Sequence, residues 1–73
     1  MDLIGGTDMN ELIIYPSRKV FTYYKGGYPV YEEVSYEQME DKNNEITFIL
    51  DNHDTYYTFN TNLIHLIKTK YGE

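Results

Sequence analysis

Residues 45–59 carry the clearest structural pattern in the chain. Apolar and other side chains alternate over the first part of this segment, with Ile46, Phe48 and Leu50 on one face and Thr47 and Ile49 on the other. This period of two residues is typical of a strand with one buried face. Turn formers follow at Asn52-His53-Asp54, and β-branched and aromatic residues return over Thr55–Phe59. The segment therefore predicts a β-hairpin.

The N-terminal half of the chain also has the composition of β-strands. A short apolar run, Leu12–Tyr15, ends at Pro16, because proline cannot donate a hydrogen bond to a sheet. Two further runs, 18–24 and 28–34, flank the sequence Lys25-Gly26-Gly27, in which the glycines supply the free φ of a tight turn. A second hairpin is therefore expected here.

The segment between the two hairpins shows a helix signal. Ser35 and Gln38 have the spacing of a capping box, in which each side chain bonds to a free amide of the first helical turn. We expect a helix of two turns, about Tyr36 to Lys42, ending at Asn43-Asn44. The alternative is that Ser35 continues the preceding strand.

Residues 60–70 fit two structures. Leu63, Ile64 and Ile67 have helical spacing, with Thr61 or Asn62 as a cap, whereas Ile64, Leu66 and Lys68 alternate as in a closing strand. The strand is favoured because the rest of the chain is β.

The predicted fold is mainly β, α+β at most: a small antiparallel sheet or barrel-like meander of about five strands with one short helix near residues 36–42.

The size of the chain limits its organisation. Residues 1–10 are expected to be a flexible lead-in and residues 11–73 a single β-rich domain. A domain of 73 residues buries only about 60% of the surface that its unfolded chain exposes, so we expect a stability of about 4–11 kcal/mol. The sequence has no cysteine to strengthen it. Small domains without disulfides often complete their core by self-association, so a homodimer is a further expectation.

Charge is concentrated in the middle of the chain. The whole chain carries a net charge of -6, but residues 32–54 contain eight acids and one base, Lys42, for a local charge of -7. Proteins that bind nucleic acid or anionic lipid do so through Lys and Arg, so neither is an expected direct partner.

If residues 36–42 are helical, Glu33, Glu37, Glu40 and Asp41 lie on one face of that helix. Such a row of carboxylates could occupy a basic groove in place of DNA. The alternative is that the acids form a solvated face that keeps the domain soluble.

Tyrosine is the second feature that favours recognition. The nine tyrosines are too many for so small a core, and tyrosine is enriched at protein interfaces because it has a large apolar face and a polar tip. We therefore expect several to be exposed beside the acids. The residues predicted to bind a partner are Glu32, Glu33, Glu37, Glu40, Asp41, Glu45, Asp51, Asp54, Tyr31 and Tyr36.

The sequence gives little reason to expect catalysis. His53 lies between Asp51 and Asp54, but ligands within four residues of a tight turn rarely converge on one ion, so we expect no metal. Neither Ser17 nor Ser35 lies in a nucleophile motif, and the glycine pairs lack the spacing of a phosphate loop. No enzyme activity and no cofactor are predicted.

The N-terminus has no signal-peptide pattern and no run is long enough to span a membrane, which favours the cytoplasm.

The overall profile resembles a family of small acidic bacteriophage proteins that take over the host cell. The resemblance rests on the short length, the net charge, the acid-rich span 32–54, the tyrosine content and the abundance of Ile, Asn, Lys and Tyr. It covers the character of the chain and no aligned motif.

Some members of that family imitate DNA and inhibit uracil-DNA glycosylase, nucleoid proteins, CRISPR nucleases or the sliding clamp. The profile is most similar to the clamp inhibitors of staphylococcal phages. The resemblance implies an inhibitor that occupies the basic DNA-binding surface of a host protein in the bacterial cytoplasm. The alternative is a small structural or assembly module of a larger complex.

Overall fold

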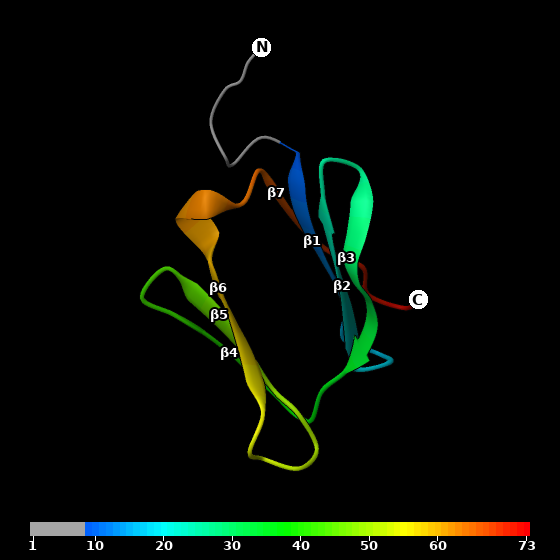
Figure 1. Cartoon of the computed structure of the whole chain (residues 1–73). Coiled ribbons are helices and arrows are strands. Elements are labelled where there is room, and N and C mark those ends of the chain that lie inside the picture. Colours follow the sequence, from blue (N-terminus) through cyan, green and yellow to red (C-terminus); the bar gives the residue numbers. More distant parts are fainter. Residues whose placement is uncertain (1–8) are drawn as a thin grey trace.

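Seven short strands and one 3-10 helix make up most of residues 9–73, which are the residues that the computed structural model describes (Figure 1). The strands are β1 (Asn10–Tyr15), β2 (Val20–Lys25), β3 (Tyr28–Ser35), β4 (Gln38–Lys42), β5 (Glu45–Ile49), β6 (Tyr56–Asn60) and β7 (Leu66–Thr69), with the 3-10 helix η1 at Thr61–Leu63. The prediction of a mainly β domain is confirmed, with seven strands in place of about five.

The strands form two sheets that face each other across the core (Figure 1). The four-stranded sheet has the order β3-β2-β1-β7, in which β7 runs parallel to β1 and the other neighbours are antiparallel. The three-stranded sheet, β4-β5-β6, is antiparallel throughout. Each sheet presents one apolar face to the other, which is the arrangement of a β-sandwich.

Both predicted hairpins are present. The β2–β3 turn has φ of 61° at Gly26 and 84° at Gly27, as a two-residue type I′ turn requires. The β5–β6 hairpin pairs Phe48 with Tyr57, and its turn is held by the Asn52 side chain. The Asn52 Oδ1 atom accepts hydrogen bonds from the backbone N–H groups of Asp54 and Thr55, at 3.0 and 3.1 Å.

The predicted helix at residues 36–42 is wrong. Ser35 is the last residue of β3, and Gln38–Lys42 form strand β4, which pairs along its whole length with β5. Asn43 and Asn44, expected to end the helix, form the β4–β5 turn with φ of 55° and 62°. A helix of two turns is marginal in water without tertiary packing, so pairing with a strongly β-forming neighbour decides the structure of this segment.

The C-terminal segment divides between a turn of helix and a strand. Thr61–Leu63 form η1, which Asn60 caps by accepting a hydrogen bond from the backbone N–H of Asn62. Leu66–Thr69 form β7, so the preferred strand is confirmed for this part. The predicted lead-in is only partly described: residues 1–8 lie outside the described residues, and Asn10 is already the buried first residue of β1.

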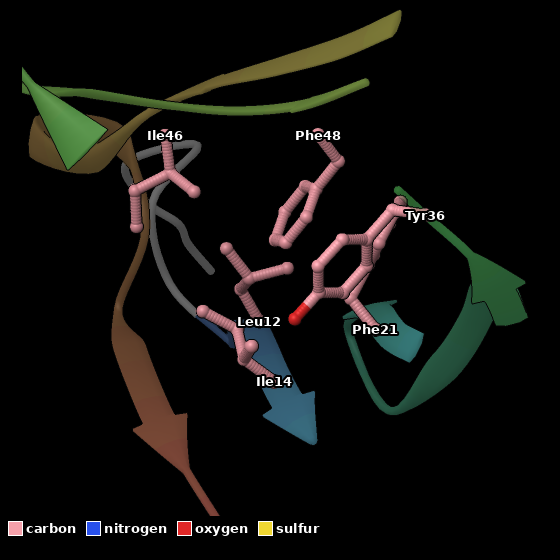
Figure 2. Packing of buried hydrophobic residues seen from close by; sticks show 6 residues of the cluster. All are labelled: Leu12, Ile14, Phe21, Tyr36, Ile46 and Phe48. Atoms are coloured by element: carbon pink, nitrogen blue, oxygen red, sulfur yellow. The ribbon is translucent and has the colours of Figure 1, made fainter. Parts of the chain in front are cut away.

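Aromatic rings fill the space between the sheets. Phe21 of β2 and Phe48 of β5 are fully buried, and their rings stack at 4.0 Å between centroids (Figure 2). Tyr36, in the link from β3 to β4, lies 5.0 Å from Phe48 and closes one end of the cluster. The remaining buried apolar residues of this core are Leu12, Ile14 and Ile46.

Candidate partner-binding surface

The eight acidic side chains of residues 32–54 are all exposed. Within residues 9–73 one ion pair is present, between Arg18 Nη1 and Glu33 Oε2 at 3.2 Å. The other seven carboxylates have no cationic partner in the described part of the chain. The fold therefore leaves most of this charge available to a partner.

The first group of acids lies on the four-stranded sheet. Glu32 and Glu33 are adjacent on β3, where the pairing shifts so that one residue of β2, Thr22, faces both of them. The extra residue is a β-bulge, which interrupts the alternation of side chains. Both carboxylates consequently line the same depression, on the side of the sheet that faces away from the core.

The second group lies on the three-stranded sheet. Glu40 and Asp41 belong to the edge strand β4, where they face Thr47 and Ile46 of β5 and so project to opposite faces of the sheet. Glu45 begins β5, opposite Lys42. In the three-stranded sheet, β6 is the strand that contacts β3, with 4.8 Å between the ring centroids of Tyr57 and Tyr31. The second group lies on β4 and the start of β5, away from this contact, and is therefore separate from the first group.

The third group lies at the end of the sandwich that contains the β5–β6 turn. Asp51 and Asp54 flank this turn. Glu37 is in the β3–β4 link, where its backbone N–H donates to the carbonyl of Ile49 at 2.7 Å. The Lys19 Nζ atom donates to the backbone carbonyl of Glu37 at 3.3 Å, so it is bound to the main chain at this point.

The predicted row of Glu33, Glu37, Glu40 and Asp41 on one helix face does not form. Its geometry required helical spacing, and the strand that replaces the helix alternates its side chains instead. The eight predicted acids are exposed, but they lie in three groups on different parts of the molecule.

The first group of acids lines a depression on the outer face of the four-stranded sheet, together with aromatic side chains. The depression has a volume of about 660 Å³ and is lined by Tyr15, Thr22, Tyr24, Pro29, Glu32 and Glu33. Tyr15, Thr22 and Tyr24 share this face because their neighbours Ile14 and Phe21 point into the core. Aromatic rings beside carboxylates are the combination that binds organic cations.

Two residues that line the depression already contact a cation of the chain itself. The Arg18 guanidinium lies over the Tyr15 ring, 4.7 Å from its centroid, and binds Glu33. Lys70 lies 5.9 Å from the same centroid on the approach from β7. Within residues 9–73, Tyr24 and Glu32 make no such contact with a cation. This half of the depression is open to a cation from outside.

Thr22 is the most buried of the residues that line the depression. The residue is only 6% exposed, and its Oγ1 atom has no hydrogen-bond partner among residues 9–73. Burying a hydroxyl without a hydrogen-bond partner lowers the stability of the fold, and most buried polar groups in proteins do have a partner.

The tyrosines are divided between the core and the surface. Tyr28, Tyr56 and Tyr71 are 77%, 65% and 77% exposed, which confirms that several are accessible. Tyr31 packs against Tyr57 and is 36% exposed. Tyr36 is 8% exposed, and its burial raises the pKa of its phenol. Tyr36 therefore belongs to the core and does not offer its ring to a partner, contrary to its place among the predicted binding residues.

Sequence reasoning missed Tyr15, Thr22 and Tyr24. Their shared face follows from strand alternation, but their meeting with Glu32 and Glu33 depends on the β-bulge in β3. Nothing in the local sequence marks that bulge.

Other kinds of site find no support in the described residues. No group of three His, Cys, Asp or Glu side chains within 9–73 is arranged to hold a metal ion, including the turn with Asp51, His53 and Asp54. In the same range, no helix is long and apolar enough to cross a membrane. Comparisons of the chain with models of known protein families, with curated protein sequences and with solved structures gave no match.

Proposed function

We propose that the protein binds a basic, DNA-binding host protein and inhibits it by occupying the surface that otherwise binds DNA. The sliding clamp, or another protein of replication, repair or nucleoid structure, is the kind of partner that this chemistry fits. One observation carries the proposal: eight carboxylates between Glu32 and Asp54 are exposed, and only Glu33 is neutralised by an ion pair within residues 9–73. Unpaired carboxylates attract a basic surface and speed the encounter with it.

The distribution of the acids favours a partner that surrounds the molecule. Acids on the outer face of one sheet, on the edge of the other and at one end of the sandwich cannot all contact a flat surface at once. The molecule measures 40 × 26 × 18 Å, and a basic channel or deep groove would contact several of these sides together. A ring-shaped protein that encircles DNA has such a channel.

Within this surface, the depression on the four-stranded sheet is the proposed anchor. A Lys or Arg side chain of the partner would lie against the Tyr24 ring and pair with Glu32, as Arg18 does with Tyr15 and Glu33. Cation–π contacts of this kind are worth about 0.5–2 kcal/mol each, depending on how far they are desolvated.

The first experiment identifies the partner. The tagged protein is used to capture proteins from a lysate of a low-GC bacterium, because Ile, Asn, Lys and Tyr, which are abundant in the chain, have A/T-rich codons. The eluates at low and high salt are compared by mass spectrometry. The proposal expects a DNA-binding protein that is retained at low salt and lost at high salt, because each carboxylate–cation pair is screened. A partner retained equally at both salt concentrations contradicts it.

The second experiment assigns the binding to a group of acids. Three variants neutralise one group each: Glu32 and Glu33 to Gln; Glu40 and Glu45 to Gln with Asp41 to Asn; and Glu37 to Gln with Asp51 and Asp54 to Asn. A control changes Asp2 to Asn and Glu73 to Gln, which removes the same charge as the first variant from outside the span. We expect the first variant to weaken binding more than the control. If all four bind as tightly as the parent, the acids serve only solubility.

The alternative, a structural or assembly module, is favoured by a different observation. Met39, Tyr56 and Leu66, at 41%, 65% and 38% exposure, all lie on strands at sheet edges. A module held by such residues would form complexes that are insensitive to salt, and replacing apolar side chains would weaken them more than neutralising acids.

A further inference from the structure

The two open sheets leave four edge strands among the described residues, and three of them are protected against pairing. β3 contains Pro29 and two irregularities of register, β4 contains Glu40, Asp41 and Lys42, and β7 has only four residues, one of them Lys68. Proline, bulges, charge and shortness are the means by which proteins prevent edge-to-edge association.

The fourth edge strand, β6, has none of these protections. It is five residues long, Tyr56–Asn60, and pairs with β5 without a bulge. It lies in the longest run of the chain without Asp, Glu, Lys, Arg or His, Thr55 to Ile64. In a protein with a net charge of -6, this is the edge at which a second copy meets the least repulsion.

The hydrogen-bond pattern shows which backbone groups of β6 face outward. The backbone N–H of Leu50 donates to the carbonyl of Thr55, and that of Thr61 donates to the carbonyl of Asn44. Antiparallel pairs alternate in their bonding, so Tyr57 and Phe59 also bond toward β5. The N–H and C=O groups of Tyr56, Thr58 and Asn60 therefore point to the open side.

We propose that two copies of the chain associate through antiparallel pairing of β6 with β6, with the two-fold axis at Thr58. This register pairs Thr58 with Thr58 of the second copy and Tyr56 with Asn60, which are the residues whose backbone groups face outward. It also pairs Tyr57 with Phe59 on the inner face. The two three-stranded sheets become one sheet of six strands, and the dimer does not depend on the proposed DNA mimicry.

Side chains on both faces suit this register. On the outer face, the hydroxyls of Thr47 and Thr58 already hydrogen-bond at 3.0 Å, and the dimer extends them into a row of four threonines. On the inner face, Tyr57 and Phe59 are only partly buried in one copy, and the second copy covers them. The contact is isologous and therefore closed, and the charged β4 edges at both ends of the joined sheet prevent further growth.

The test measures mass in solution by light scattering coupled to size-exclusion chromatography over a range of concentrations. The proposal expects twice the chain mass of 8.7 kDa for the parent protein. Thr58→Lys and Thr58→Asp each place like charges opposite one another at the axis, so each raises the dimer dissociation constant by about tenfold or more. An equimolar mixture of these two variants restores the dimer, because Lys then faces Asp.

A control and a second readout separate association from folding. Gln38→Lys adds the same charge to the other edge of the same sheet and leaves the dimer intact. Circular dichroism confirms that each variant keeps its strands, and hydrogen exchange shows the amides of Tyr56, Thr58 and Asn60 protected in the parent and exchanging in Thr58→Lys. A monomeric parent protein overturns the proposal, and so does a mixture of the variants that fails to restore the dimer.

Discussion

A few aromatic residues hold the two sheets together. Phe21 and Phe48 stack at 4.0 Å, and Phe59 meets Phe21 edge to face at 5.6 Å between ring centroids. The apolar surface that each large ring buries contributes a large share of the stability expected for a domain of this size, about 4–11 kcal/mol. Alternation identifies Phe48 as a core residue from sequence alone. The burial of Tyr36 depends on the path of the β3–β4 link, which no local pattern specifies.

Thr22 is a residue at which a single change should stabilise the protein. Its buried hydroxyl has no hydrogen-bond partner in the part of the chain that the structure describes, and valine has nearly the same shape without the polar group. We expect Thr22→Val to raise the free energy of unfolding by about 1 kcal/mol. Urea denaturation measures the change. Thr47→Val is the control: it removes a hydroxyl that bonds to Thr58, so no gain is expected. A loss of stability in Thr22→Val would mean that the hydroxyl is satisfied in solution.

Tyr36 predicts a specific pH dependence. Its burial raises the pKa of the phenol in the folded state above its value of about 10 in the unfolded chain. The stabilisation that this provides is complete below about pH 10 and is lost as the pH rises through the folded pKa. Tyr36→Phe should therefore lose less stability than the parent between neutral and alkaline pH, measured by urea denaturation. Tyr28→Phe, at an exposed ring, should follow the parent. Equal alkaline losses in Tyr36→Phe and the parent would contradict the assignment.

At the scale of elements, the sequence predicts those hairpins whose strands alternate in polarity and whose turns contain turn-forming residues. The hairpin at 45–59 and the glycine turn at 26–27 were predictable, because alternation and turn residues specify them directly. The capping-box signal at Ser35 and Gln38 misled, because pairing of Gln38–Lys42 with β5 outweighs a helix too short to be stable alone. The parallel pairing of β7 with β1 joins segments far apart in the chain, so no sequence pattern within either segment reveals it.

The two type I′ turns make opposite predictions. Gly27 has φ of 84° and open space around its Cα, so Gly27→Ala should cost about 1 kcal/mol through backbone strain alone. Asn44 has φ of 62° at the equivalent position of the β4–β5 turn, where glycine is preferred. Asn44→Gly should therefore raise the midpoint of thermal unfolding, and Gly27→Ala should lower it. A shift in the same direction for both would show that backbone conformation does not control these turns.

At the scale of the whole molecule, the sequence predicted which side chains are charged and exposed but not how they are grouped. The eight acids of residues 32–54 reach the surface as expected. Their division into three groups follows from the arrangement of β3 and β4 in different sheets, which depends on long-range pairing. The aromatic and acidic depression at Tyr24 and Glu32 arises from that pairing and from the bulge in β3.

The most direct test of the proposed function is a competition with DNA. A labelled DNA duplex is bound to the basic protein captured from the lysate, and the acidic protein is added while fluorescence anisotropy is recorded at low and high salt. We expect that the duplex is released, that release needs more protein at high salt, and that the Glu32 and Glu33 double variant releases it less effectively than the Asp2 and Glu73 control. A partner that keeps its DNA while it binds the acidic protein would contradict DNA mimicry.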